Sequence, residues 1–143
     1  MTHAEMWDAF SRETGMEAPY EAWAFGDDAD ALAELVRKGV KTATASLLCW
    51  YSPEELPREG QYSVILDSRD RAVCIIRNTK VYTVRFDAVS RDHAWKEGEG
   101  DRSLEYWRSV HEAFFRKELG DIPFDSTMEV VCEEFETVFR SVL

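Results

Sequence analysis

The amino-acid sequence predicts an α+β protein in which a small mixed β-sheet, closed or nearly closed into a barrel, is flanked by helices. Apolar and polar residues alternate as in a strand at 61–67, 72–86 and 128–139. Segments whose apolar residues recur at helical spacing lie before and between these stretches. The stretch 72–86 is interrupted by Arg77-Asn78-Thr79, so we expect either two strands or one sharply bent strand. Such bends allow a small sheet to curl.

Length and composition suit a single domain over residues 1–143, with an N-terminal helical extension over about residues 1–26. The chain has 143 residues, of which 45% are hydrophobic, enough to bury a core without metal or disulfide staples. Its three cysteines, Cys49, Cys74 and Cys132, lie far apart in apolar surroundings. They predict buried thiols in a reducing compartment rather than a zinc site or a disulfide framework.

The N-terminus begins with Thr2-His3-Ala4-Glu5, which has the pattern of a capping box and lacks the positive charge and apolar run of a signal peptide. No stretch approaches the roughly 20 apolar residues of a membrane span. We therefore expect a cytoplasmic protein with no membrane partner.

The net charge of −11 disfavours broad, sequence-blind binding of nucleic acid, which depends on cationic surface. The charge is uneven, because residues 69–108 hold nine Lys or Arg against seven acids, a local +2 that leaves −13 for the rest. This distribution predicts a small basic cleft on an acidic body, suited to a nucleotide or a short single strand.

The first third of the chain predicts two helices joined by an aromatic-rich connection. Residues 3–14 carry an apolar stripe and should cover one side of the sheet. Residues 19–26 are expected to be a connection that lies over the core. Residues 27–38 form the second predicted helix, with Asp27 as N-cap and Gly39 in the left-handed conformation that ends it.

A strand rich in hydroxyls follows this helix. Thr42, Thr44 and Ser46 alternate with small apolar residues, and Lys41 adds a charge at the start. The pattern predicts a row of hydroxyls beside open space, with Lys41 at its mouth. The alternative is that Lys41 extends into water and that the threonines merely favour a strand.

A second polar stretch, 93–101, precedes the predicted helix 103–119. Two glycines at alternate positions disfavour regular structure, so we expect an exposed loop that holds Glu97, Glu99 and Asp101. The alternatives are a solvated acidic loop that helps to cap the next helix, and carboxylates that hold a divalent metal. Because the full calcium-loop pattern is missing, we assign no metal and no other cofactor.

The motif Gly39-x-Lys41-x-x-Thr44 resembles the opening signature of the ASCH domains, which are relatives of the PUA-like RNA-binding barrels. Trp23 to Gly26, Lys41 to Leu47 and Glu97 to Trp107 also resemble a largely uncharacterised bacterial subfamily of that family. The resemblance runs over roughly residues 20–140. It implies a PUA-like small mixed β-barrel with flanking helices and a ligand cleft at the barrel mouth.

The resemblance also implies site residues. In an ASCH amidohydrolase that deacylates 4-acetylcytidine, the lysine and threonine of the signature work with a glutamate preceded by a His-Ala pair. His93-Ala94-Trp95-Lys96-Glu97 matches that spacing, so the catalytic candidates are Lys41, Thr44 and Glu97, with Glu99 second to Glu97.

The sequence departs from the signature at Ser46, where the family usually has an arginine, and this weakens the transfer of phosphate contacts. Another ASCH protein, nearer to this subfamily, resembles a ribonuclease that acts on single strands. In chemical terms, Lys41 could activate the Thr44 hydroxyl if desolvation lowered the lysine pKa. If Lys41 instead stays charged and paired with Glu97, it can only stabilise negative charge or hold a ligand.

Three functions remain open. The resemblance implies either a hydrolase acting on acylated cytidine or single-stranded RNA, or a non-catalytic RNA- or nucleotide-binding module, and the acidic composition allows a protein-interaction domain that uses its surface. The first two have RNA or a nucleoside or nucleotide as partner. The candidate substrate-binding residues are Thr42, Ser46, Arg77, Tyr82, Arg85, Trp95, Glu99 and Arg102.

Overall fold

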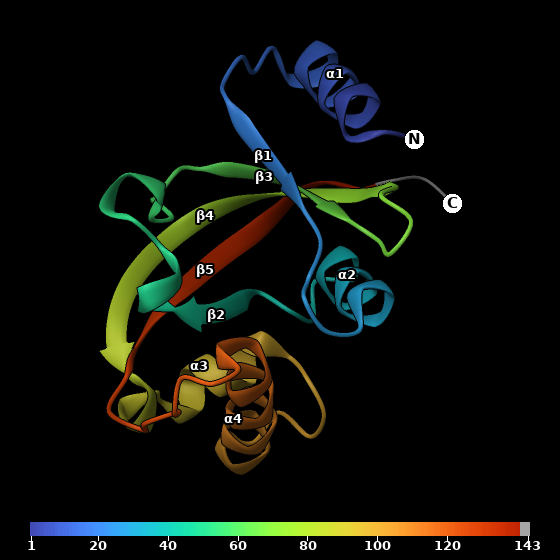
Figure 1. Cartoon of the computed structure of the whole chain (residues 1–143). Helices are drawn as coiled ribbons and strands as arrows, with labels where there is room; N and C mark the ends of the chain where they lie inside the picture. Colours follow the sequence, from blue (N-terminus) through green and yellow to red (C-terminus); the bar gives the residue numbers. More distant parts are fainter. Residues whose placement is uncertain (141–143) are drawn as a thin grey trace.

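The computed structural model of the chain describes residues 1–140 and leaves residues 141–143 of the predicted domain outside the described part (Figure 1). Its elements in chain order are α1 (His3–Thr14), β1 (Tyr20–Trp23), α2 (Ala29–Arg37), β2 (Ala43–Leu47), η1 (Leu48–Trp50), η2 (Pro53–Glu55), β3 (Tyr62–Leu66), β4 (Ala72–Arg85), η3 (Phe86–Ala88), α3 (Arg91–Glu97), α4 (Leu104–Leu119) and β5 (Glu129–Arg140).

The strands form one mixed, five-stranded sheet in the order β1-β3-β4-β5-β2. Only β1 and β3 are parallel; the other neighbours are antiparallel. The two longest strands, β4 and β5, lie side by side and curve together across the molecule (Figure 1). The interrupted stretch 72–86 is thus one bent strand, with register shifts at Ile75/Ile76 and Asn78/Lys80.

The α+β class is confirmed, and the sheet is curled but not closed. Within residues 1–140, the edge strands β1 and β2 do not pair with each other. The opening between these two edges is therefore the mouth of a barrel-like fold, and both edges contribute residues to the cavity described below.

Helices cover both faces of β3, which explains why all five residues of this strand are buried. On one face, Met6 and Phe10 of α1 pack with Val64 and its neighbours, as the apolar stripe predicts. On the other face, Val36 of α2 packs with Ile65. The capping box at Thr2 and Glu5 forms as expected, with both reciprocal hydrogen bonds present.

Helices α3 and α4 lie together below the β2 side of the sheet (Figure 1). Trp107 and Phe115 of α4 pack with Leu47 of β2 and Val130 of β5 in a third apolar cluster. This packing holds the loop between α3 and α4 against the start of β2, where the signature lysine lies.

The sequence interpretation is wrong for two short elements. The connection 19–26 contains β1, a strand of four residues whose parallel partner, β3, is distant in sequence. The stretch 93–101 is not wholly an exposed loop, because its first half is the end of α3. Ser90 caps this helix by accepting a hydrogen bond from the His93 backbone N–H, and Gly98 ends it.

Two smaller expectations also need correction. The N-cap of α2 is Asp28 rather than Asp27, because the chain makes its turn one residue later. Cys49 is exposed in the 3-10 turn after β2, whereas Cys74 and Cys132 are buried free thiols as predicted. In residues 1–140, no helix combines the length and apolar character needed to cross a membrane.

Candidate functional site

A cavity of about 670 Å³ lies at the barrel mouth between the two edge strands. Its walls come from β1, β2, the segment between β2 and β3, the start of β3, β5, and the α3–α4 region. This volume falls within the roughly 300–1,000 Å³ of small-molecule sites. A second cavity, of about 710 Å³ near α1 and α2, includes none of the catalytic candidates among its described walls.

Lys41 reaches this cavity from the turn between α2 and β2. Gly39 adopts the predicted left-handed conformation, and the backbone N–H groups of Val40 and Lys41 both donate to the Leu35 carbonyl. The turn points the lysine inward, where only 1% of the side chain is exposed. A buried cation needs compensating partners, and the α3–α4 region supplies them.

All three N–H donors of the Lys41 ammonium are engaged. Its Nζ lies 3.1 Å from Glu97 Oε1, 2.8 Å from Glu99 Oε2 and 3.4 Å from the Glu97 carbonyl oxygen. Burial lowers the Lys41 pKa, but the charges of Glu97 and Glu99 outweigh it, and the net pKa is raised. The contacts and the direction of the pKa therefore favour the charged ammonium over the neutral amine.

Glu97 is the centre of a buried polar network. Its Oε1 contacts Lys41 and, at 3.2 Å, His111 Nε2, while its Oε2 lies 2.7 Å from His93 Nε2 and 2.6 Å from the donating Trp107 Nε1. Burial raises the Glu97 pKa, but the charges of Lys41 and His111 and the hydrogen bonds of the histidines bring it well below 4.5. Its carboxylate is ionised and saturated with donors.

The surroundings of His111 favour its doubly protonated form. Its Nε2 faces the ionised Glu97, and its Nδ1 lies 2.9 Å from the Trp107 carbonyl oxygen, an atom that can only accept. Burial lowers the His111 pKa, but the attraction of Glu97 outweighs it, and the net pKa is raised.

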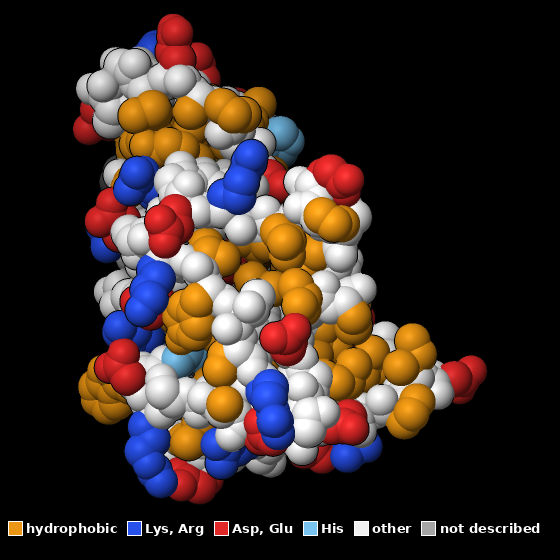
Figure 2. All heavy atoms as spheres, turned by 90° about the vertical axis from the view of Figure 1, so that its left-hand side faces the viewer, with side chains coloured by type: hydrophobic (Ala, Val, Ile, Leu, Met, Phe, Trp, Pro, Cys, Tyr) orange, Lys and Arg blue, Asp and Glu red, His pale blue; other side chains and the backbone are white. Residues whose placement is uncertain are grey.

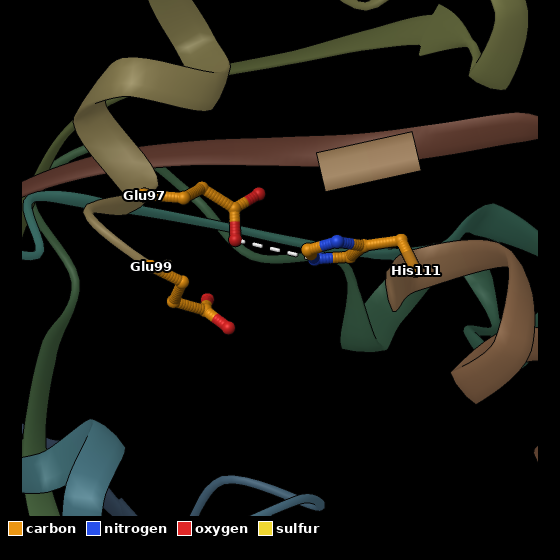
Figure 3. Close-up of side chains that lie close together, drawn as sticks. All are labelled: Glu97, Glu99 and His111. Atoms are coloured by element: carbon orange, nitrogen blue, oxygen red, sulfur yellow. Dashed lines mark ion pairs between the residues drawn. The ribbon is translucent and has the colours of Figure 1, made fainter. Parts of the chain in front are cut away.

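Figure 3 shows how Glu97, Glu99 and His111 converge from α3, the following loop and α4. Their nearest donor atoms lie within 4.8 Å of one another, a spacing that a metal ion could use. The ammonium of Lys41 already bonds both carboxylates and would repel a second cation. This arrangement favours the ammonium over a divalent metal.

Gly98 holds the two halves of the site together. Its φ is +74°, and a Cβ built on it would lie 2.6 Å from the Val40 carbonyl oxygen and 3.1 Å from Lys41 Cα. Only a glycine permits this approach of the α3 C-terminus to the α2–β2 turn. Thr42 adds a second link, since its backbone N–H and its hydroxyl both donate to the Lys96 carbonyl.

Two of the three residues in the predicted hydroxyl row reach the cavity. Thr44 and Ser46 line the cavity, but Thr42, although predicted to bind substrate, is not among its walls. Thr44 stands directly opposite Glu133 of β5 in the antiparallel register. The Ser46 hydroxyl lies 2.7 Å from the Tyr51 hydroxyl, so it helps to position the segment after β2.

Five further predicted substrate-binding residues, Arg77, Tyr82, Arg85, Trp95 and Arg102, are not among the cavity walls. The Arg85 guanidinium pairs with the neighbouring Asp87, at 2.7 Å, on the surface. The Arg102 guanidinium stacks on the exposed Trp95 ring, 3.7 Å from its centroid. These two arginines therefore interact with a nearby carboxylate or aromatic ring outside the cavity.

Tyr82 and Arg77 are likewise occupied elsewhere. The Tyr82 hydroxyl lies 3.4 Å from His93 Nδ1, and Tyr82 is not among the cavity walls. Burial is the first cause of its raised pKa. Arg77 belongs to the bent part of β4 near Gly60. Glu99 is the one predicted binding residue besides Ser46 that lies in the cavity wall.

The expectation of a basic cleft is wrong, because the cavity is acidic. Among the described residues of its wall, Lys41 is the sole lysine or arginine, against the carboxylates of Glu21, Asp27, Glu54, Glu55, Glu97, Glu99 and Glu133. Four of the nine cations of residues 69–108, namely Arg71, Arg85, Arg91 and Lys96, form ion pairs outside the cavity. Figure 2 shows Lys and Arg side chains interspersed with Asp and Glu on one face.

Sequence reasoning missed Glu133 as a cavity residue. Its Oε1 accepts a hydrogen bond of 3.0 Å from Asn78 Nδ2. Desolvation by burial, with smaller contributions from the charges of Glu21 and Glu97, raises the Glu133 pKa to about 7. The signal in the sequence was a pair of glutamates, Glu133-Glu134, that interrupts an otherwise apolar strand.

Comparison with known proteins gives the family. The model of the ASCH domain family matches residues 21–139. A solved structure of a protein from Enterococcus faecalis is 36% identical, covers 96% of this chain and 88% of its own, and superposes with a TM-score of 0.87. The ASCH domain from Lactobacillus crispatus is 32% identical, with coverages of 96% and 91% and a TM-score of 0.84.

A more distant structure, the ASCH protein from Zymomonas mobilis, shares the fold at 9% identity, with coverages of 82% and 68% and a TM-score of 0.51. No functionally curated protein matches the chain. The family match covers most of the chain and agrees with the two relatives above 30% identity. The protein therefore belongs to the ASCH domain family.

Proposed function

We propose that the cavity binds an uncharged modified nucleoside and that the protein hydrolyses an acyl–nitrogen bond of this ligand. One observation carries the proposal: the cavity has aromatic walls, many carboxylates and a single ammonium. A phosphate group would meet carboxylates at close range, whereas an uncharged base and ribose would not be repelled. The charge therefore favours a nucleoside over a nucleotide or an RNA strand.

Aromatic side chains supply contacts for a base. Trp23 and Phe25 from the β1 side, Trp50 and Tyr51 after β2, and Phe114 of α4 all line the cavity. Stacking of a base on an aromatic ring contributes about 1–3 kcal/mol in proteins that bind nucleic-acid bases. The acidic residues around these rings can accept hydrogen bonds from ribose hydroxyls and exocyclic amines.

Thr44 is the nucleophile of the proposed reaction and Lys41 the source of positive charge. A ligand carbonyl that displaces the Glu99 carboxylate would take its place at Lys41 Nζ. Glu99 is the exchangeable partner, since 16% of its side chain is exposed against 1% for Glu97. Negative charge developing on the carbonyl oxygen would then be stabilised by an ammonium in a poorly solvated site.

Ribonuclease activity is less well supported. A single strand needs cations along its backbone, and the arginines that could provide them, Arg77, Arg85 and Arg102, are not part of the cavity wall. A non-catalytic nucleoside-binding module uses the same cavity and differs only in the absence of turnover, so the experiment below separates the two.

The test compares 4-acetylcytidine, its 5′-monophosphate and a short single-stranded RNA by calorimetry and by chromatography of the products. We expect binding and deacetylation of the nucleoside, and weaker binding of the monophosphate. Thr44→Val should abolish turnover while nucleoside binding persists, and Thr83→Val, on an exposed position of β4 outside the cavity, should retain turnover. Binding without turnover would reduce the proposal to a binding module, and tight binding of RNA alone would refute it.

A further inference from the structure

We propose that Glu133 is the acid–base residue of this cavity: it takes the proton of the Thr44 hydroxyl during attack and returns it to the departing nitrogen. The inference rests on the proposed hydrolysis of an acyl–nitrogen bond and adds the group that activates its nucleophile. Three features of the structure support it, namely the position of Glu133, the engagement of the other titratable groups and the environment of its carboxyl.

Position is the first feature. Thr44 of β2 and Glu133 of β5 are directly opposite partners in the antiparallel register, and both line the cavity. Opposite residues on one face have Cβ atoms about 4.5–5.5 Å apart, so rotation of the side chains can bring hydroxyl and carboxyl into hydrogen-bond contact. The Asn78 amide holds one carboxyl oxygen of Glu133 and thereby fixes the direction of the other.

The other titratable groups near Thr44 are engaged. Lys41 is a charged ammonium without a free lone pair, and His111 contacts acceptors through both ring nitrogens. Glu97 receives donors at both oxygens, and Glu99 bonds to Lys41. Glu133 stands beside Thr44 on the sheet, and its carboxyl lines the cavity. Among the described residues, its side chain accepts a hydrogen bond from the neutral amide of Asn78.

The surroundings of Glu133 suit proton exchange near neutral pH. It faces Glu21 from β1, Glu97 from α3, Asn78 from β4 and Tyr51 from the segment after β2. Burial and the two negative charges raise its pKa to about 7, and the Asn78 hydrogen bond opposes this rise. A general acid–base group works best when its pKa is close to the working pH, because both protonation states are then populated.

The proton and bond changes balance. As the bond between Thr44 Oγ1 and the acyl carbon forms, the hydroxyl proton moves to the Glu133 carboxylate. The acyl–nitrogen bond then breaks, and Glu133 gives its proton to the nitrogen, leaving an ester on Thr44. Water, deprotonated by Glu133, attacks the ester, and the proton returns to the Thr44 oxygen. The net reaction consumes one amide and one water and yields an amine and a carboxylic acid.

The main test is Glu133→Gln, whose amide oxygen can still accept from Asn78. We expect kcat for deacetylation to fall by about 100-fold or more with little change in KM, and the limb of the pH profile near neutrality to disappear. Infrared difference spectroscopy of the ligand-free protein should show a carboxyl that titrates near pH 7 in the wild type and is missing in the variant.

Two further variants sharpen the test. Glu21→Gln removes a like charge and should move both the infrared titration and the kinetic limb to lower pH. Glu134→Gln is the matched control: this neighbouring glutamate pairs with Lys96 and is not among the cavity walls, so neither readout should change.

The outcomes separate the two proposals. Unchanged kcat and pH profile in Glu133→Gln, with an active wild type, would overturn the role of Glu133 and leave the hydrolase intact. If the wild type is active but shows no carboxyl titration near neutral pH, the role of Glu133 would also be overturned and the hydrolase proposal would stand. Failure of the wild type to hydrolyse any acylated nucleoside would refute the hydrolase proposal, and the acid–base role would fall with it.

Discussion

Lys41 and Glu97 form an ion pair in the interior of the protein, although 56 positions separate them in the sequence. Their nitrogen and oxygen atoms are 3.1 Å apart, and each side chain is 1% exposed. The pair joins the α2–β2 turn to the end of α3 at the wall of the cavity. Its role is therefore both structural and electrostatic.

Breaking this pair from one side should destabilise the fold. Lys41→Met leaves two carboxylates without their ammonium, and loss of one partner of a buried pair costs about 3–5 kcal/mol. Urea denaturation should show this loss, and the double variant Lys41→Met/Glu97→Gln should cost less than the sum of the single variants. Arg91→Met, which breaks an exposed pair with Glu105, is the control and should have a smaller effect. Single losses that simply add would argue against a coupled pair.

Gly98→Ala should be far more damaging than Gly15→Ala. Both glycines have a φ of +74°, but a Cβ at Gly15 meets nothing within 4 Å, whereas at Gly98 it lies 2.6 Å from the Val40 carbonyl oxygen. The shared backbone strain costs roughly 1–2 kcal/mol, and the steric clash adds to it only at Gly98. Thermal denaturation of the two variants measures the difference. Equal losses would show that the close contact with the α2–β2 turn is unimportant.

Stability should fall as the pH rises through the titration of His111. The folded-state pKa is raised above 6.5, so the charged imidazolium contributes its full stabilisation below pH 6.5 and loses it as the pH passes the folded pKa. Glu97, whose pKa is well below 4.5, stays ionised throughout this window.

The measurement is the free energy of unfolding from pH 6 to 9 in the wild type and in His111→Gln, which keeps a donor for Glu97. The variant should show a weaker pH dependence in this range. An identical slope in both proteins would mean that His111 is not the titrating group.

Binding of RNA should be weak and strongly dependent on salt. The chain carries a net charge of −11, and its cavity adds carboxylates rather than cations. Few phosphates can therefore be neutralised, and fluorescence anisotropy should show the residual affinity falling steeply between ~0.05 and ~0.2 M salt. Tight binding of a duplex that persists at ~0.2 M salt would contradict the charge distribution described above.

Much of the fold was predictable from local patterns. The capping box at Thr2, the left-handed Gly39 and the alternation of 61–67 each depend on neighbours within a few positions, and each appears in the structure. The two elements that were missed, β1 and α3, are short. A four-residue strand becomes visible only through its partner β3, and a seven-residue helix has too few turns to show a clear apolar stripe.

The sequence by itself determined the fold class, the signature residues Lys41 and Thr44, and the glutamate that pairs with the lysine. The tertiary structure alone decided that Lys41 is buried between two carboxylates, that the cavity is acidic, and that Glu133 stands beside Thr44. The physical reason is that exposure, protonation and the sign of a pocket's charge depend on groups brought together from distant segments. Local patterns encode which side chains are present, but their pKa values depend on the desolvation and the neighbouring charges that folding creates.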